Sequence, residues 1–368
     1  MNTEQIKTPR PHSFKRNAVD AKVRDFIHTL PKAELHLHLE GSVEPATLAE
    51  LTHRHTTPLS FANNRYAAGT SSHGELSEAA ITELYRYRDF TGFLMAFKAV
   101  TDRLCTPDDY ELITYRLLER LRSQNVLHAE VYVSVGVVHW RGQEFEPLFE
   151  GMERGRIRGE RDFGVSLLWL FDAVRHFGPE AARRVVGEAV RLRRKYPSVV
   201  GFGIGGDERR AAPELFRNVY AYARGEGLHV TAHAGETGGP ESIWGAINLG
   251  AERLGHALNA WHDRELMAVL AQKQIPLEIC LTSNMRTGCC VALDHHPVKT
   301  FFDLGLMVTL NSDDPAMFST TLAEEYELAQ SEFGFSNEHL REVARNSFEA
   351  SFLPAEKKLA FLNQVDAI

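Results

Sequence analysis

The sequence predicts an α/β protein built as one closed TIM (β/α)8 barrel, and three observations lead to this fold. Eight short β-rich runs recur along the 368-residue chain, and each ends in a polar cluster. Helical patterns separate most of these runs, and alternation of this kind with apolar strands is typical of a parallel sheet. The number of units matches a (β/α)8 barrel, which often spans about 200–400 residues as one domain.

The expected elements follow one another in a regular order. The strands are predicted at residues 33–40, 128–136, 164–174, 198–208, 228–236, 252–258, 276–284 and 307–314. Apolar residues at helical spacing predict helices at 107–124, 179–195, 213–225, 240–249, 263–273, 297–304, 322–332 and 337–362. A helix between two strands supplies the crossover that a parallel pair requires.

Two segments depart from this alternation. Residues 1–18 are polar and lack the apolar core of a signal peptide, so we expect a mobile tail there and a single domain over 19–368. The segment 41–127, between the first two strands, is far longer than an ordinary crossover and has room for extra helices. Because loops after barrel strands lie on the catalytic face, this insertion is a candidate active-site lid. Its polar stretch 61–80 is equally compatible with a surface loop without function.

The composition excludes several classes of protein. With 43% hydrophobic and 24% charged residues, the chain is not disordered, collagenous or membrane-spanning. The 41 basic and 49 acidic residues give a net charge of −8, which argues against nucleic-acid and anionic-lipid partners. Four cysteines are too few for a disulfide framework, so we expect a cytoplasmic location. None of these features determines the oligomeric state.

A dinucleotide-binding fold is the alternative for an α/β sequence. Gly203-Ile204-Gly205-Gly206 superficially resembles its phosphate-binding turn. This turn should follow the first strand, but here it lies in the fourth strand unit. Asp207-Glu208-Arg209 also stand where the third glycine should be, so the barrel is preferred.

Histidines and acidic residues gather at the ends of the expected strands. His36 and His38 alternate with leucines, so a strand directs both imidazoles to one face. Such a pair alone is often only a hydrogen-bonded pair in the core. His233, His256 and the Asp313-Asp314 pair, however, stand near the ends of the fifth, sixth and eighth strands, and in a barrel all these ends converge on one mouth.

Three imidazoles and one carboxylate form a ligand set that suits a divalent transition metal, zinc first. Zinc takes such ligands at about 2.0–2.2 Å and keeps a position for water, whereas calcium and magnesium require more oxygens. Water on zinc loses its proton near pH 7, which permits hydrolysis without a covalent intermediate. Glu236, three residues after His233, can supply the proton that a leaving group requires. The alternative role of Glu236 is an N-cap residue or an acid in the first turn of the following helix.

Six short motifs follow one another from about Pro31 to Phe352. They are His36-Leu-His38-Leu-Glu40-Gly41-Ser42, Gly206-Asp207-Glu208, His233-Ala-Gly-Glu236, Gly255-His256, Thr282-Ser283-Asn284 and Asn311-Ser-Asp313-Asp314-Pro315. This ordered set resembles the adenosine deaminase family of the amidohydrolase superfamily. The resemblance implies one zinc ion per chain and hydrolysis of the 6-amino group of an adenine nucleoside to a 6-oxopurine and ammonia.

The resemblance also implies a role for each matching residue. His36, His38, His233 and Asp313 match the zinc ligands. Glu236 matches the acid that protonates ring N1, which makes C6 electrophilic for a zinc-activated water, and His256 matches the group that polarises this water. Asp313 belongs with both as a catalytic residue. The matching substrate contacts are His38, Glu40, the N–H of Gly206 toward N3, and Asp314 toward N7.

Departures from the family pattern concern the substrate more than the reaction. Glu40 stands where adenosine-specific members carry Asp against the 5′-hydroxyl, and Ala257 and Leu281 replace a commoner Gly and Pro. Gly206-Asp207-Glu208 resembles the nucleoside-specific branch, whereas the free-adenine branch resembles Ser-Ser-Glu there.

Several functions therefore remain open at this point. Adenosine or a related nucleoside is the first candidate. Aminodeoxyfutalosine, an adenine nucleoside with a bulky 5′ extension on one route to menaquinone, is the main rival. Remoter alternatives are an adenine deaminase, another barrel metallohydrolase such as a phosphoesterase, and a non-catalytic nucleoside-binding protein.

Overall fold

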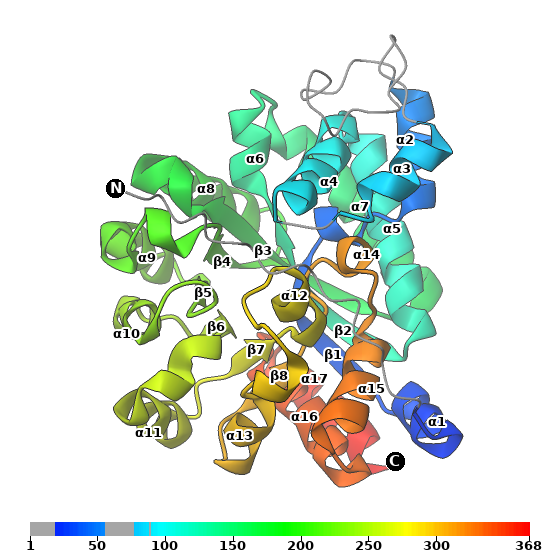
Figure 1. The fold of residues 1–368 in the computed structure, drawn as a ribbon. Coiled ribbons are helices and arrows are strands. Elements are labelled where there is room, and N and C mark those ends of the chain that lie inside the picture. The colour runs from blue at the N-terminus through cyan, green and yellow to red at the C-terminus, as the bar shows by residue number, and fades with distance from the viewer. Residues whose placement is uncertain (1–18, 56–76, 88–89) are drawn as a thin grey trace, which may run out of the picture.

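The protein folds as a barrel of parallel strands surrounded by helices (Figure 1). The structure, a computed structural model, describes residues 19–55, 77–87 and 90–368. The tail expected at 1–18 and most of the polar stretch 61–80 lie outside these described residues.

Eight strands pair in parallel in the order in which they occur along the chain. They are β1 (Lys32–His38), β2 (Val126–Val133), β3 (Ser166–Val174), β4 (Val199–Gly205), β5 (His229–Ala234), β6 (Arg253–His256), β7 (Leu277–Ile279) and β8 (Val308–Leu310). The amide of His38 donates to the carbonyl of Asp313 at 2.8 Å, and the amide of Asp313 donates to the carbonyl of His36 at 3.1 Å. These bonds join β1 to the chain after β8, so the predicted TIM barrel is confirmed.

Helices cover the outer face of the barrel, which is why every residue of β1 and β2 is buried. The helices up to β5 are α1 (Ala21–Thr29), α2 (Pro45–Arg54), α3 (Glu78–Leu84), α4 (Phe90–Arg103), α5 (Pro107–Ser123), α6 (Val135–Trp140), α7 (Phe145–Phe163), α8 (Gly178–Arg193) and α9 (Arg217–Gly225). The remaining helices are α10 (Pro240–Leu249), α11 (Arg264–Lys273), α12 (Leu281–Arg286), α13 (Val298–Asp303), α14 (Pro315–Phe318), α15 (Leu322–Phe333), α16 (Asn337–Ala350) and α17 (Ala355–Asp366). Among the described helices, none is both long and apolar enough to cross a lipid bilayer.

Some expected elements have the wrong bounds. The strand predicted at 276–284 ends at Ile279, and its last residues belong to helix α12. The helix predicted at 337–362 is two helices, because Pro354 has no N–H with which to continue the first one. The sequence patterns did not predict α7 at all.

The insertion between β1 and β2 contains the short 3-10 helix η1 (Glu40–Ser42) and helices α2, α3 and α4 before the barrel helix α5. The ring of Phe93 in α4 stacks on Phe318 with 5.2 Å between centroids. The hydroxyl of Tyr87 donates to the carbonyl of Met317 at 2.9 Å. Both contacts reach the segment that follows β8, so this part of the insertion lies at the carboxyl end of the barrel. That 41–127 acts as a lid stays a prediction.

Candidate active site

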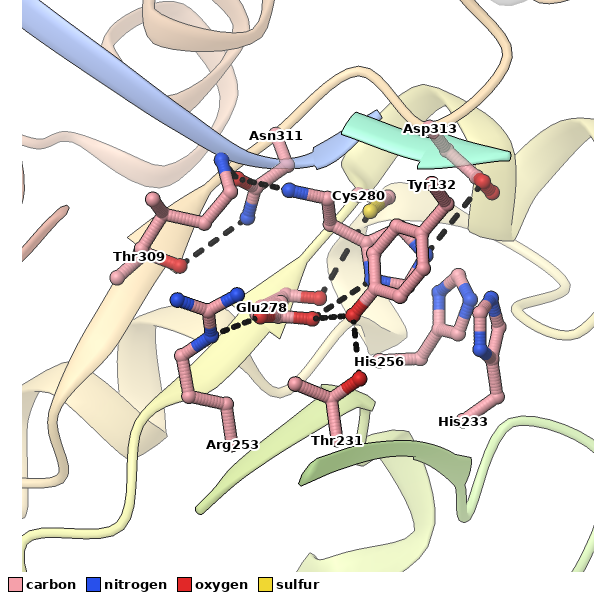
Figure 2. Close-up of polar contacts among 12 residues, drawn as sticks. Tyr132, Thr231, His233, Arg253, His256, Glu278, Cys280, Thr309, Asn311 and Asp313 are labelled. Atoms are coloured by element: carbon pink, nitrogen blue, oxygen red, sulfur yellow. Dashed lines mark hydrogen bonds and ion pairs between the residues drawn. The ribbon is translucent and has the colours of Figure 1, made fainter. Parts of the chain in front are cut away.

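Four histidines and one aspartate converge at the carboxyl ends of the strands; Figure 2 labels His233, His256 and Asp313. The Nε2 atom of His38 lies 3.3 Å from Nε2 of His233 and 3.4 Å from Oδ1 of Asp313. The Nε2 atom of His36 lies 3.6 Å from the same oxygen. The fold therefore brings together all four residues predicted as metal ligands.

Neighbouring groups orient three of these side chains. Nδ1 of His36 pairs with Oε2 of Glu278 at 2.8 Å, and Nδ1 of His233 lies 3.2 Å from a backbone carbonyl of β4. The hydroxyl of Ser283 donates to Oδ2 of Asp313 at 2.6 Å. These bonds leave Nε2 of both imidazoles and Oδ1 of Asp313 for another partner, which is the usual arrangement of metal-ligating histidines.

The charges of the cluster favour a cation at its centre. Burial lowers the pKa of His38 to about 4 and that of His233 well below its usual value, so both offer neutral nitrogens. Burial also opposes protonation of His36, but Asp313 and Glu278 raise its pKa to about 10. Nε2 of His36 is buried without a hydrogen-bond partner. Positive charge is thus stabilised beside His36 and Asp313, and this donor set fits zinc.

Two sets of four donors share this centre. The ligand atoms of His36, His233, His256 and Asp313 all lie within 4.8 Å of one another. The set predicted from the sequence has His38 in place of His256. The choice between them depends on which nitrogen of His256 carries the proton.

The backbone is unusual at two residues of the cluster. His256 and Asp313 have φ angles of 63° and 65°, a left-handed conformation that is uncommon for residues other than glycine. Such conformations cost about 1–3 kcal/mol each and concentrate at functional sites. Ala257 follows with a φ of 51°, which explains why the family pattern has glycine there.

Glu236 lies beside the cluster and not on a helix. Its Oε2 is 3.7 Å from Nε2 of His256, and burial raises its pKa. Helix α10 begins only at Pro240, and its first-turn acid is Glu241. The position of Glu236 therefore rules out the helix-terminus alternative, and its role as the proton donor stays a prediction. The thiol of Cys289 reaches Oε1 of Glu236 at 3.5 Å, a contact that the sequence did not predict.

Glu208 is a second acidic residue of this region, and the sequence analysis gave it no role. Its Oε1 accepts the N–H groups of Glu236 at 2.8 Å and Thr237 at 3.0 Å. Its Oε2 accepts the N–H of Gly235 at 2.8 Å and the hydroxyl of Ser242. One carboxylate therefore holds the loop that carries Glu236. The signal available in the sequence was an acidic residue at the end of the fourth predicted strand.

Two further buried carboxyl groups lie at the ends of β1 and β3. Oε1 of Glu40 accepts the N–H of Ser134 at 3.0 Å, and its Oε2 has no hydrogen-bond partner. Oδ1 of Asp172 is also buried without a partner. Burial raises the pKa of Glu40 to about 7 and that of Asp172 to about 8. The sequence analysis missed Asp172, although an acid in an otherwise apolar strand was visible.

The two remaining predicted substrate contacts also lie at this end of the barrel. Asp314 follows Asp313, and its Oδ1 is buried without a partner. A Cβ atom on Gly41 would lie 1.8 Å from this oxygen, so only glycine fits there. Gly206 directly follows β4, has a φ of 91° and is exposed.

Comparison with known proteins identifies relatives over almost the whole chain. Residues 31–368 match the family model described as adenosine deaminase. The aminodeoxyfutalosine deaminase of Streptomyces coelicolor is 36% identical over 342 residues, which cover 93% of this chain and 85% of the relative.

Solved structures give the same picture of the fold. The adenine deaminase of Arthrobacter aurescens superposes with a TM-score of 0.83 at 29% identity and covers 92% of this chain and 98% of its own. An amidohydrolase of Burkholderia ambifaria with bound zinc superposes with a TM-score of 0.78 at 27% identity, covering 98% of this chain and 96% of its own.

Proposed function

The chain belongs to the adenosine deaminase family, and on that premise we propose that it is a zinc-dependent aminohydrolase of adenine nucleosides. Its reaction replaces the 6-amino group with oxygen and releases ammonia. The observation that carries this proposal is the buried histidine–aspartate cluster with the protonatable Glu236 at its edge.

The proposed zinc ligands are His36, His38, His233 and Asp313. A zinc ion held there would supply the nucleophile, because zinc lowers the pKa of water to about 7. Glu278 and Ser283 hold His36 and Asp313 in the orientation that such binding needs. Removal of such supporting contacts typically costs 10–100-fold in metal affinity.

Glu236 is the proposed proton donor to ring N1. Burial raises its pKa, and this direction suits a general acid, because a carboxyl with a raised pKa holds its proton to a higher pH. Protonation of N1 withdraws electrons from C6, where water adds, and ammonia then leaves from the tetrahedral carbon. His256, Asp314 and the N–H of Gly206 are the proposed contacts to the water, N7 and N3.

The sugar end of the substrate is assigned to Glu40 and Asp172. A sugar hydroxyl can donate to a carboxyl oxygen that lacks a partner, and a free base has no such group. This favours a nucleoside over adenine. Among nucleosides, the aminodeoxyfutalosine deaminase relative supports a 5′-extended substrate as the alternative to adenosine.

Ammonia release from a panel of substrates tests this function. The panel is adenosine, 2′-deoxyadenosine, methylthioadenosine, aminodeoxyfutalosine and adenine. We expect at least one nucleoside to exceed adenine by about 30–1000-fold in kcat/KM, since adenine leaves the buried carboxyls unpaired. Preference for adenine would overturn the nucleoside assignment. If no member of the panel releases ammonia, the proposed deaminase activity is overturned.

A further inference from the structure

His256 lies at the end of a chain of hydrogen bonds that begins at a backbone amide. The N–H of Val298 lies 3.1 Å from Nδ1 of His296. Nε2 of His296 lies 3.2 Å from Oδ1 of Asn284, and Nδ2 of Asn284 lies 3.1 Å from Nδ1 of His256. The three side chains come from separate segments of the chain and are all at least 95% buried.

The first donor in this chain sets the direction of every later bond. A backbone N–H can only donate, so Nδ1 of His296 must be the acceptor and cannot carry a proton. A neutral imidazole then carries its proton on Nε2, and this N–H donates to Oδ1 of Asn284. Burial lowers the pKa of His296 to about 3, which agrees with a neutral ring.

The direction continues through the amide to His256. Because the amide oxygen of Asn284 faces His296, its NH2 group faces His256 and donates to Nδ1. Nδ1 of His256 therefore holds a lone pair, and the proton of this imidazole lies on Nε2. That N–H is the group 3.7 Å from Glu236.

We propose that His296 and Asn284 are positioning residues that fix His256 as the Nε2–H tautomer, so that His256 is a hydrogen-bond donor to the reacting oxygen and not a metal ligand. A nitrogen that bears hydrogen has no lone pair for a cation. This assignment selects His38 over His256 as the fourth ligand. Its effect on turnover rests on the proposed function, whereas the tautomer does not.

The sharpest variant is Asn284→Asp, because a carboxylate has the same shape but can only accept. It can still accept from His296, but it now requires a proton on Nδ1 of His256. We expect kcat/KM to fall on the order of 10³-fold or more, as when a catalytic imidazole is held in the wrong tautomer. His296→Phe removes the first acceptor and should give a smaller loss of about 10-fold.

Nitrogen NMR of the holoenzyme labelled with ¹⁵N-histidine reads the tautomer directly, with His256→Gln used to assign the signals. We expect wild-type His256 to carry its proton on Nε2 and Asn284→Asp to place a proton on Nδ1. His295→Phe is the matched control, because the exposed side chain of His295 takes no part in this series of hydrogen bonds. This variant should change neither the His256 signal nor turnover.

Three outcomes would overturn the proposal: a wild-type proton on Nδ1 of His256, an unchanged tautomer in Asn284→Asp, or a protonation change in Asn284→Asp with kcat/KM within about 3-fold of wild type. A protein that gives the expected NMR signals but deaminates none of the substrate panel would instead overturn the proposed function and leave the tautomer assignment intact.

Discussion

Buried carboxyl groups occur at two levels of this barrel: in the lower interior, where Glu130 and Glu278 lie, and at the rim, which is the mouth formed by the carboxyl ends of the strands. Their surroundings differ. In the lower interior, every carboxyl oxygen of Glu130 and Glu278 has a hydrogen-bond donor. Arg253 binds Glu130 and also reaches Oε1 of Glu278 at 2.6 Å, as Figure 2 shows for the second pair. The N–H of Phe352 and the ring of His128 are the hydrogen-bond partners of the other oxygen of Glu130, Oε1. At the rim, Glu40, Asp172 and Asp314 each keep one buried oxygen without a partner.

The pKa values follow this difference. Burial alone would raise the pKa of Glu130, but Arg253 and His128 lower it to about 2. Burial also raises the pKa of Asp172 at the rim, but there no partner outweighs it, and the pKa rises to about 8. The paired carboxylates of the lower interior are therefore expected to contribute to stability, whereas the unpaired rim oxygens can accept from a bound molecule, as the proposed function requires.

The largest expected effect is at the rim. His233→Ala removes a proposed ligand, so we expect loss of bound zinc and a fall in kcat of about 10³-fold or more, with the fold retained. Metal analysis of the purified protein, activity and circular dichroism measure this. The wild type should hold about one zinc per chain, and an active metal-free preparation would contradict the proposed mechanism.

Glu236→Gln separates the acid from the metal. The amide cannot deliver a proton to N1, so turnover should fall by about 10²–10⁴-fold while zinc content stays at the wild-type level. Steady-state kinetics and metal analysis of the same preparation give both numbers. Near-normal turnover would move the acid role to another group.

The lower interior should respond in stability. Glu130→Gln leaves the guanidinium of Arg253 with one buried carboxylate fewer. We expect the free energy of unfolding, measured in urea, to fall by about 3–5 kcal/mol. Glu188→Gln is the control, since its pair with Arg191 is partly exposed and should cost under about 1 kcal/mol. Equal losses in both variants would remove the contrast between interior and surface pairs.

The same carboxylate predicts a pH dependence. The folded-state pKa of Glu130 is about 2, against an ordinary value of 4.5, so its stabilisation is complete above about pH 4.5 and is lost as the pH falls toward 2. The loss should reach a few kcal/mol. Urea unfolding at several pH values from 6 to 3 measures it, and the curve of Glu130→Gln should be flatter than that of the wild type.

Glu208 combines the features of both levels: it lies at the rim, but its carboxylate is fully hydrogen-bonded, and it supports the loop that carries Glu236. Glu208→Gln loses one acceptor for those N–H groups, so we expect kcat to fall by about 10–100-fold with KM nearly unchanged. Asp207→Asn, whose side chain pairs with exposed Arg209, should stay near wild type. A change in KM alone would indicate a substrate contact instead.

The smallest expected effect is at Cys289. Its thiol is a weak donor to Glu236, so Cys289→Ala should change kcat by only about 2–5-fold. Cys290→Ala is the neighbouring control, since its thiol reaches the carbonyl of Ala292 and should not affect turnover. Complete inactivation by Cys289→Ala would show that this thiol does more than contact the acid.

Local patterns in the sequence were sufficient to predict the barrel and the side chains that gather at its mouth. Strand alternation placed His36 and His38 on one face, and closure of a parallel barrel brings the ends of all strands to one mouth, so the cluster could be predicted without coordinates. Element ends were less certain, because the change from strand to helix at Leu281 depends on local hydrogen bonds and not on hydrophobic period. The lid role of 41–127 is still a prediction.

What only the tertiary structure decided is which buried polar groups have partners. Glu208 and Gly235, or Asn284 and His256, are separated by many residues and become neighbours only when the barrel closes. Whether a buried oxygen of Glu40 or Asp172 lacks a partner is likewise decided only by the folded structure. Residue type and spacing determine which side chains face inward, but hydrogen bonds act over about 3 Å, and contacts of that range depend on the packing of the whole chain.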